Sequence, residues 1–205
     1  YWFWKSDTLN FNKKKSVSFL LKKEKEIINK YPSAGDGGTG LVNGLTSRYQ
    51  FYNFLKLKSS ALESLQGHII KNIKMCINKF NREGKHIPTN DLWALCWFNV
   101  LRKNEKISQH KHRGLWDAEK SFLSGHLTIQ AESTSTHYLS VCENYAWCIE
   151  NIPGQLIIFP TYVPHYTDTT LSKSPRISVA FDVYDKKDLG EPAFIDRGTC
   201  IPIHI

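Results

Sequence analysis

The sequence predicts a mainly β protein in which helices support a jelly roll. From Leu92 onward, short apolar runs rich in β-branched and aromatic residues alternate with polar turns and prolines, a pattern typical of an antiparallel sandwich or barrel. Before Leu92, one long segment repeats its apolar residues at helical spacing. The chain has 205 residues, 41% of them hydrophobic, so it can bury a core within one domain.

The N-terminal part is predicted to be a support made of helices and loops. Residues 7–30 mix lysines with apolar residues, which indicates a short strand leading into a helix. The glycine-dense segment 31–41 lacks the Lys-Ser/Thr ending of a phosphate-binding loop, so we expect a loop that covers another part of the molecule. Ser60 and Glu63 have capping-box spacing, and the apolar residues after them predict a helix that ends near Arg82.

Five strands are expected in the second part of the chain, and we predict that residues 92–185 form the jelly-roll core. Residues 1–91 would then be its support and residues 186–205 a C-terminal tail, all within a single domain. The runs that predict the strands are Leu92–Leu101, Phe122–Ile129, His137–Val141, Gln155–Phe159 and Ile177–Tyr184.

Charge and cysteine content limit the partners and the compartment. The net charge is +8, and residues 1–30 hold eight lysines against three acids, but the whole chain is rich in lysine, so we expect no nucleic-acid partner. Five cysteines without a C-x-x-C pair predict reduced thiols and a cytoplasmic protein, in the host cytoplasm if the source is viral. No apolar run is long enough to span a membrane. The oligomeric state stays open, as does a segment preceding Tyr1.

His110 and His112 are the first candidate metal ligands. They are two residues apart, so in an extended segment both side chains point to the same face. One strand could then offer two imidazoles to one metal ion. Paired histidines also occur at exposed turns, so the pair alone is a weak signal.

His165, Arg176 and Ser178 form a second candidate group. An apolar run ends at a proline-flanked turn that carries His165, and Arg176 follows eleven residues later, just before the last expected strand. A strand returning from that turn could place the guanidinium of Arg176 beside the metal. There it would pair with a carboxylate through two hydrogen bonds, while the Ser178 hydroxyl adds a third. The spacing therefore links these three residues to one site.

Five motifs in this order resemble the 2-oxoglutarate- and Fe(II)-dependent oxygenases, in particular a branch seen in phage and marine bacterial sequences. The motifs, spread over residues 93–184, are Trp97-x-Asn99, His110-x-His112, Ser124-Gly125, Pro153-Gly154…Phe159-Pro160…His165 and Arg176-x-Ser178. The resemblance implies a double-stranded β-helix with one Fe(II) at its mouth, held by His110, His112 and His165. It implies 2-oxoglutarate and O2 as co-substrates, with Arg176 and Ser178 anchoring 2-oxoglutarate. The expected reaction is hydroxylation of an unactivated C–H in a small molecule or an amino-acid side chain, with release of succinate and CO2.

Other polar residues are candidates for the same pocket. Asn99 and Tyr138 could bond the co-substrate, although each could equally be an ordinary core residue. His126 lies on an expected strand, one face of which should line the pocket. Arg48 and Arg113 could recognise an anionic group of the substrate, but arginines chosen by position alone are usually solvated.

The third metal ligand stays open. Most members of the wider superfamily have Asp or Glu two residues after the first histidine, where this chain has His112. Three neutral imidazoles are one possibility, and a carboxylate from Asp117 is a second. A third is a position left for a halide, as in halogenase-like relatives.

Two other functions compete with the oxygenase. A cupin-like metal-binding or isomerase barrel would also use histidines at its mouth, and a non-catalytic nucleic-acid or virion-associated module would fit the basic charge. Only the oxygenase requires the Arg-x-Ser element at this distance from a histidine, so we favour it. The sequence does not predict the substrate, which we expect segments 35–44, 113–120 and the tail after Lys186 to determine.

Overall fold

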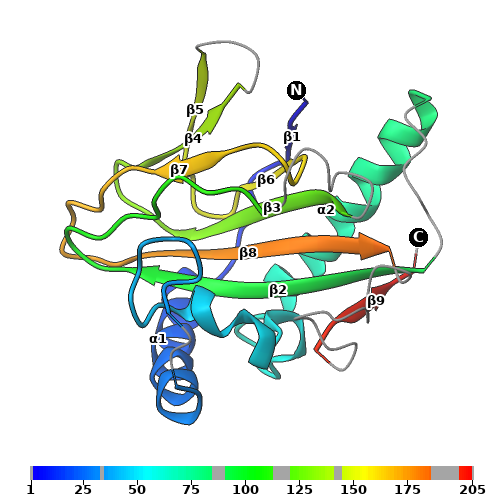
Figure 1. Cartoon of the computed structure of the whole chain (residues 1–205). Helices are drawn as coiled ribbons and strands as arrows, with labels where there is room; N and C mark the ends of the chain where they lie inside the picture. The colour runs from blue at the N-terminus through cyan, green and yellow to red at the C-terminus, as the bar shows by residue number, and fades with distance from the viewer. Residues whose placement is uncertain are drawn as a thin grey trace.

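The computed structural model describes residues 2–32, 35–84, 91–112, 121–140, 145–185 and 199–204. Within these ranges the chain forms two antiparallel sheets, two α-helices and two short 3-10 helices (Figure 1). The helices are α1 (Lys13–Lys30), η1 (Leu45–Phe51), η2 (Phe54–Lys56) and α2 (Glu63–Arg82). The strands are β1 (Trp4–Lys5), β2 (Leu92–Leu101), β3 (Ser121–Gln130), β4 (Ser135–Leu139), β5 (Ala146–Glu150), β6 (Leu156–Phe159), β7 (His165–Thr167), β8 (Arg176–Asp185) and β9 (Ile201–Ile203).

Six strands form the larger sheet, in the order β1-β6-β3-β8-β2-β9. Strand β8 pairs antiparallel with β3 on one side and with β2 on the other. The pairing of β2 with β8 runs without interruption from Leu92 opposite Asp185 to Leu101 opposite Arg176. The strands expected over residues 92–101 and 177–184 are therefore confirmed, and β3 corresponds to the strand expected near residue 122.

The two faces of β8 serve different parts of the molecule. The residues that pack in the apolar core with the helices are Ile177, Val179, Phe181 and Val183. The residues that alternate with them, Arg176, Ser178 and Ala180, line a cavity. Because side chains alternate along a strand, β8 separates the apolar core from a polar cavity.

Helix α1 packs on β3. It buries Ser16, Leu20, Glu24 and Ile27, which recur every three or four residues, so the apolar residues around Leu20 belong to one helical stripe. The strand expected within residues 7–30 is therefore wrong. The helix begins at Lys13, and the side chain of Asn12 caps it by accepting a hydrogen bond from the Lys15 amide at 3.0 Å. Strand β1 lies earlier in the chain and pairs with β6.

Helix α2 confirms the helix predicted after Glu63, but not the predicted capping box. Its N-cap residue is Leu62, which makes no side-chain cap bond. Ser60 instead accepts a hydrogen bond from the Lys15 ammonium at 2.9 Å. The apolar residues that α2 buries are Leu65, Ile69, Ile73, Cys76, Ile77 and Phe80. Packing of this stripe, and not a local cap, defines the helix.

Three strands form the smaller sheet, in the order β5-β4-β7. The fully buried Tyr138 of β4 joins the two sheets, because its ring lies 5.0 Å from the ring of Phe159 on β6, measured between centroids. Next to β7, an isolated antiparallel bridge connects His165 to His110. Together the two sheets form the predicted jelly roll. None of the described helices is both long and apolar enough to cross a membrane.

Candidate active site

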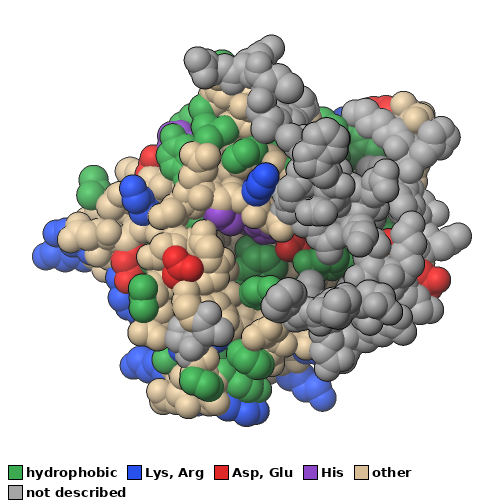
Figure 2. Space-filling view, viewed as in Figure 1, with side chains coloured by type: hydrophobic (Ala, Val, Ile, Leu, Met, Phe, Trp, Pro, Cys, Tyr) green, Lys and Arg blue, Asp and Glu red, His purple; other side chains and the backbone are tan. Residues whose placement is uncertain are grey.

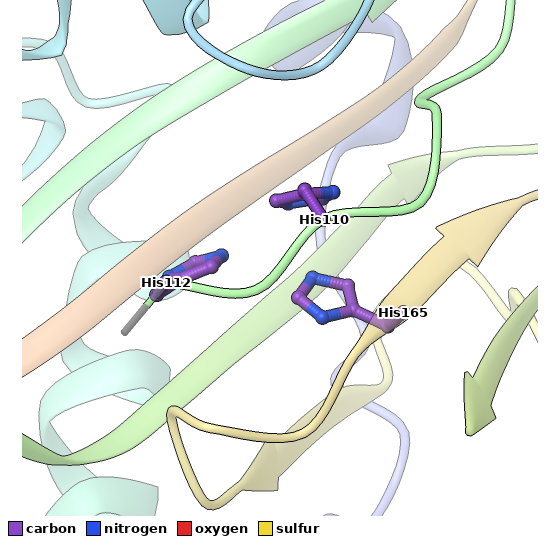
Figure 3. A group of neighbouring side chains, drawn as sticks. All are labelled: His110, His112 and His165. Atoms are coloured by element: carbon purple, nitrogen blue, oxygen red, sulfur yellow. The ribbon is translucent and has the colours of Figure 1, made fainter. Parts of the chain in front are cut away.

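Three histidines meet where the segment before β3 passes β7 (Figure 3). His110 and His165 exchange both backbone hydrogen bonds, at 3.0 and 2.9 Å, so their rings lie 4.3 Å apart between centroids. The ring of His112 is 5.4 Å from that of His110 and 5.2 Å from that of His165. One nitrogen of each imidazole lies within 4.8 Å of the other two, a spacing that one metal ion can bridge.

Each of the three rings has its Nδ1 atom held by an oxygen. The oxygen is the Ser108 carbonyl for His110 at 2.9 Å and the Val163 carbonyl for His165 at 3.0 Å. For His112 it is the Asp182 carboxylate, at 2.5 Å. An Nδ1–H that donates in this way fixes the tautomer and leaves the Nε2 lone pair for a metal. The protein thus orients all three candidate ligands through neighbouring oxygens.

Burial keeps two of these histidines neutral. Burial, together with the proximity of His112, lowers the pKa of His110 to about 4. Burial also lowers the pKa of His165 well below its ordinary value, with His110 and His112 adding to the effect. The neutral imidazole is the form that binds a metal ion. Both side chains are therefore ready to bind near pH 7.

Asp182, which the sequence reasoning missed, is a further candidate residue of the site. Its side chain is buried, and besides His112 it accepts hydrogen bonds from the Ser124 hydroxyl at 2.5 Å and the Tyr184 hydroxyl at 3.1 Å. Burial alone would raise the pKa of Asp182, but the His112 imidazole and these hydrogen bonds hold it below its ordinary value. A signal existed: an acid stands in a buried strand at an even spacing from Arg176 and Ser178.

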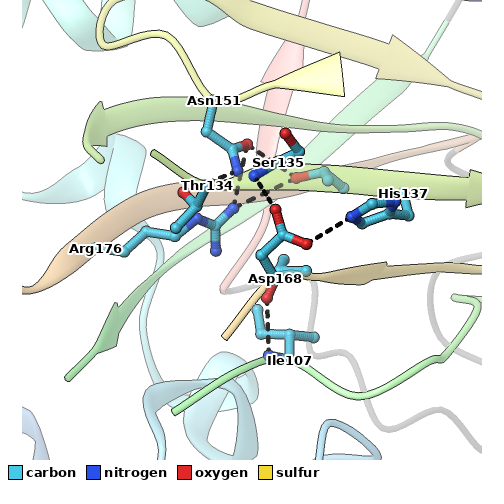
Figure 4. A network of polar contacts seen from close by, with 9 residues as sticks. Ile107, Thr134, Ser135, His137, Asn151, Asp168 and Arg176 are labelled. Atoms are coloured by element: carbon cyan, nitrogen blue, oxygen red, sulfur yellow. Dashed lines mark hydrogen bonds and ion pairs between the residues drawn. The ribbon is translucent and has the colours of Figure 1, made fainter. Parts of the chain in front are cut away.

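Arg176 is a buried cation with an incomplete set of partners (Figure 4). The side chain is 2% exposed, and its Nη2 atom makes long contacts to Asn151 at 3.4 Å and Thr136 at 3.5 Å. Its Nε and Nη1 atoms have no hydrogen-bond partner within the part of the chain that the structure describes. Burial lowers the pKa of Arg176 to about 10, so the guanidinium remains charged at neutral pH. Such a group is suited to receive an anion.

The nearest acid does not satisfy Arg176. Asp168 accepts hydrogen bonds from the Ser135 amide and from the His137 ring, each at 2.7 Å, as Figure 4 shows. Each oxygen of this carboxylate already accepts one hydrogen bond, and no acid among the described residues forms an ion pair with Arg176.

One cavity contains both the histidines and Arg176. Histidine atoms are visible in a hollow on the face shown in Figure 2. The lining residues are Thr39, Thr46, Trp97, Asn99, Ile107, His110, His112, Gly125, His126, Thr136, Phe159, His165, Thr167, Arg176, Ser178 and Ala180. A candidate metal site and a candidate anion site thus share one space.

The remaining predicted co-substrate contacts reach this cavity to different degrees. Ser178 and Asn99 line it, and the Asn99 side-chain oxygen accepts a hydrogen bond from Thr46 at 2.5 Å. Tyr138 lies behind His126, whose Nε2 atom is 2.6 Å from the Tyr138 hydroxyl. It is His126 that lines the cavity, with its Nδ1 atom unpartnered among the described residues. Burial lowers the pKa of His126 to about 3, helped by Arg176, so this ring is neutral.

The glycine-dense loop covers the cavity, as expected. Asp36 closes a turn by accepting hydrogen bonds from the amides of Gly38 at 2.9 Å and Gly40 at 3.1 Å. Thr39 lines the cavity, and its carbonyl accepts a hydrogen bond from the Ser108 amide at 2.8 Å, two residues before His110. The loop and the metal-ligand segment are therefore fastened together.

Arg48 is not available to a substrate, contrary to one possibility raised by the sequence. It is 2% exposed, and it donates hydrogen bonds to the backbone carbonyls of Tyr31, Asn43 and Gly44 at 2.7 to 2.9 Å. Its role is to fix both sides of the glycine-dense loop. Arg113 and Asp117, the other candidates, lie outside the described residues.

A family sequence model and several solved structures are similar to this chain. The model of a family described as "Putative 2OG-Fe(II) oxygenase" matches residues 117–182, about a third of the chain. The matched segment contains His165, Arg176 and Ser178, whereas His110 and His112 precede it. No curated protein matches the sequence. The resemblance to a phage branch stays a prediction.

The solved structures agree on the fold. A prolyl-4-hydroxylase from Pseudomonas putida has a TM-score of 0.54 and 11% identity, over 90% of this chain and 85% of that one. The viral collagen prolyl hydroxylase of Paramecium Bursaria Chlorella virus-1, in its 2OG complex, has a TM-score of 0.52 and 10% identity, over 89% and 96%. The non-heme alpha ketoglutarate dependent epimerase SnoN from nogalamycin biosynthesis has a TM-score of 0.54 and 11% identity, over 89% and 77%. The chain therefore shares the double-stranded β-helix fold and, over residues 117–182, the sequence signature of the 2-oxoglutarate- and Fe(II)-dependent oxygenases.

Proposed function

We propose that this chain is an Fe(II)- and 2-oxoglutarate-dependent oxygenase that hydroxylates an unactivated C–H. The substrate class is a small molecule or an amino-acid side chain, and the other products are succinate and CO2. One observation carries the proposal: a cluster of oriented histidines and the unpartnered guanidinium of Arg176 line the same cavity. A metal-binding barrel that isomerises sugars would have no need of a buried cation beside its metal.

The donor set fits Fe(II). We propose His110, His112 and His165 as the ligands, because their Nδ1 atoms are engaged and the opposite nitrogens lie together. Three protein ligands leave positions for a co-substrate and for O2. When bound, the iron would supply the activation of O2, and the protein would supply orientation and the exclusion of water. A carboxylate from Asp117 or a halide position stays an alternative for the third ligand.

The other end of the cavity fits a dicarboxylate. Arg176 would pair its free Nε and Nη1 groups with the distal carboxylate of 2-oxoglutarate, a bidentate geometry that guanidinium groups favour. Ser178 and Asn99 would add hydrogen bonds from the same cavity wall. Tyr138 would contribute by holding His126 in place. The apolar side chain of Ile107 in the same lining would help to keep water from the reacting atoms.

The similar structures support the substrate class. Two are prolyl hydroxylases, and the third is an epimerase from nogalamycin biosynthesis. We also propose that residues 1–205 form one oxygenase domain, with 1–91 as support, 92–185 as the jelly-roll core and 186–205 as the tail. Pairing of β1 with β6 and of β9 with β2 supports a single unit, because both flanking parts add strands to the larger sheet.

An anaerobic titration tests the proposed function. Protein loaded with Fe(II) should develop a weak visible charge-transfer band when 2-oxoglutarate is added, and succinate should form when air is admitted. Without iron, neither signal should appear. Absence of both the band and succinate in iron-loaded protein would rule out the oxygenase.

A further inference from the structure

We propose that Asp182 is a positioning residue that provides, through His112, the negative charge that an Asp or Glu ligand provides in most of the superfamily. The inference rests on the proposed iron site and assigns a second layer to it. In this chain the position of the usual carboxylate ligand holds an imidazole, and a buried carboxylate lies directly behind that imidazole.

The three histidines differ in the hydrogen-bond acceptor of their Nδ1 atoms. His110 and His165 donate to neutral backbone carbonyls at 2.9 and 3.0 Å. His112 alone meets a carboxylate, and at 2.5 Å the contact is the shortest of the three. Hydrogen bonds with an ionised partner are shorter and stronger than neutral ones. The charged acceptor Asp182 therefore contacts His112, the one proposed ligand that takes the place of an Asp or Glu in most of the superfamily.

The surroundings of Asp182 stabilise its ionised form without neutralising it by a fixed cation. Ser124 and Tyr184 each donate a hydroxyl to the carboxylate. Within the described ranges, its ion-pair partner is His112 and no lysine or arginine. Hydrogen bonds of this kind compensate a buried charge for its loss of water. The negative charge consequently stays directed at His112.

The geometry has a chemical consequence for a bound metal. When Nδ1–H of His112 donates to a carboxylate, electron density moves toward Nε2, and that nitrogen becomes a stronger base. The carboxylate also offsets part of the charge of a divalent ion. The site keeps three nitrogen ligands while it regains the charge of a site with two histidines and one carboxylate.

The test measures the dissociation constant of Fe(II), under anaerobic conditions by competition with a chromogenic chelator, in four proteins. They are the unmodified chain, Asp182→Asn, His112→Asp and the double variant. In the unmodified background, Asp182→Asn should weaken iron binding by about 10- to 100-fold. In the His112→Asp background the ligand itself carries the negative charge and no imidazole connects Asp182 to the metal, so Asp182→Asn should weaken iron binding by less than about threefold.

The loss of the effect in the second background separates the proposal from a purely structural role. A carboxylate that only maintained the fold would weaken binding equally in both backgrounds, and that result would overturn the inference. If Asp182→Asn alone does not fold, the comparison of His112→Asp with the double variant still decides, and a loss of iron affinity of about 10-fold or more between those two proteins would overturn it. Ser124→Ala keeps the carboxylate and removes the hydroxyl that donates to Asp182 and lies 3.1 Å from His112 Nδ1, so iron affinity should fall less than in Asp182→Asn.

The failure of the inference can be distinguished from the failure of the proposed function. If the unmodified chain binds no Fe(II), the iron site itself is wrong. If it binds Fe(II) and Asp182→Asn leaves the dissociation constant unchanged in both backgrounds, only the role of Asp182 is wrong.

Discussion

The two ends of the cavity differ in how many of their polar side-chain atoms already have a hydrogen-bond partner in the protein. At the histidine end, every Nδ1 atom already has an acceptor, so the three rings are oriented before any metal arrives. At the other end, two nitrogens of Arg176 have no partner among the described residues, although the side chain is 2% exposed. The comparison indicates that the protein alone orients the candidate metal ligands, whereas the proposed anion site would be completed only by its ligand.

The unpartnered guanidinium of Arg176 lowers the free energy of unfolding of the protein without a ligand. A buried polar group that has lost its water without gaining a partner costs on the order of 1–3 kcal/mol, and a charged one costs more. An anion that paired with Arg176 would recover this energy. The proposed binding of a carboxylate would thus follow from the same feature that destabilises the empty cavity.

Removal of a metal ligand should have the largest effect. His165→Ala should weaken Fe(II) binding by more than about 100-fold, because the ring is central to the cluster and loss of second-layer contacts alone costs 10- to 100-fold. Equilibrium titration with Fe(II) under nitrogen measures this. His137→Ala is the matched control: this histidine lies on β4, bonds Asp168 and does not line the cavity, so iron affinity should be unchanged. Equal losses in both variants would contradict the assignment.

Removing the charge of Arg176 should weaken the binding of 2-oxoglutarate and leave the affinity for Fe(II) unchanged. Arg176→Gln should raise the half-saturating 2-oxoglutarate concentration by about 30-fold or more, since truncating a buried charge pair costs 2 kcal/mol or more. The affinity for Fe(II) without 2-oxoglutarate should stay the same. Arg102→Gln serves as control, because Arg102 pairs with Glu24 outside the cavity. An unchanged 2-oxoglutarate dependence in Arg176→Gln would mean that another cation binds the co-substrate.

Two buried arginines should respond in opposite directions to the same substitution, with smaller effects. In protein free of ligands, Arg176→Met should raise the free energy of unfolding by about 1 kcal/mol, because it removes an incompletely paired charge. Arg48→Met should lower it by about 2 kcal/mol, because three loop carbonyls lose their donor. Urea unfolding at equilibrium measures both. A destabilised Arg176→Met protein would show that its guanidinium is already satisfied.

The sequence predicted the long elements better than the short ones. Strand β2 has the predicted bounds because all but one of its ten residues are buried and all but Asn99 are apolar. Strand β5 alternates between exposed and half-buried residues, and β7 has three residues, so neither produces a hydrophobic pattern strong enough to recognise. Residues 17–21 were misjudged because five apolar-rich residues fit a strand and a helical stripe equally well.

Within the candidate site, local spacing located residues, but their partners depend on tertiary structure. The H-x-H spacing and the return from His165 to Arg176 place the side chains that line the cavity. Nothing in that spacing tells that Asp182 lies behind His112, or that the Tyr138 hydroxyl meets His126. The first contact joins residues 70 positions apart, and the second depends on how the two sheets pack, so a single sequence carries no signal for either.

The short strands at the two edges of the larger sheet limit the aggregation of copies of this molecule. Beyond β6 lies β1, with two residues, and beyond β2 lies β9, with three. Short edge strands present few free amides and carbonyls to another chain, a known protection against edge-to-edge aggregation. Without β1, the edge would be β6, whose four residues are all buried and apolar. The two residues of β1 therefore protect the colloidal stability of a sheet that forms one wall of the candidate site.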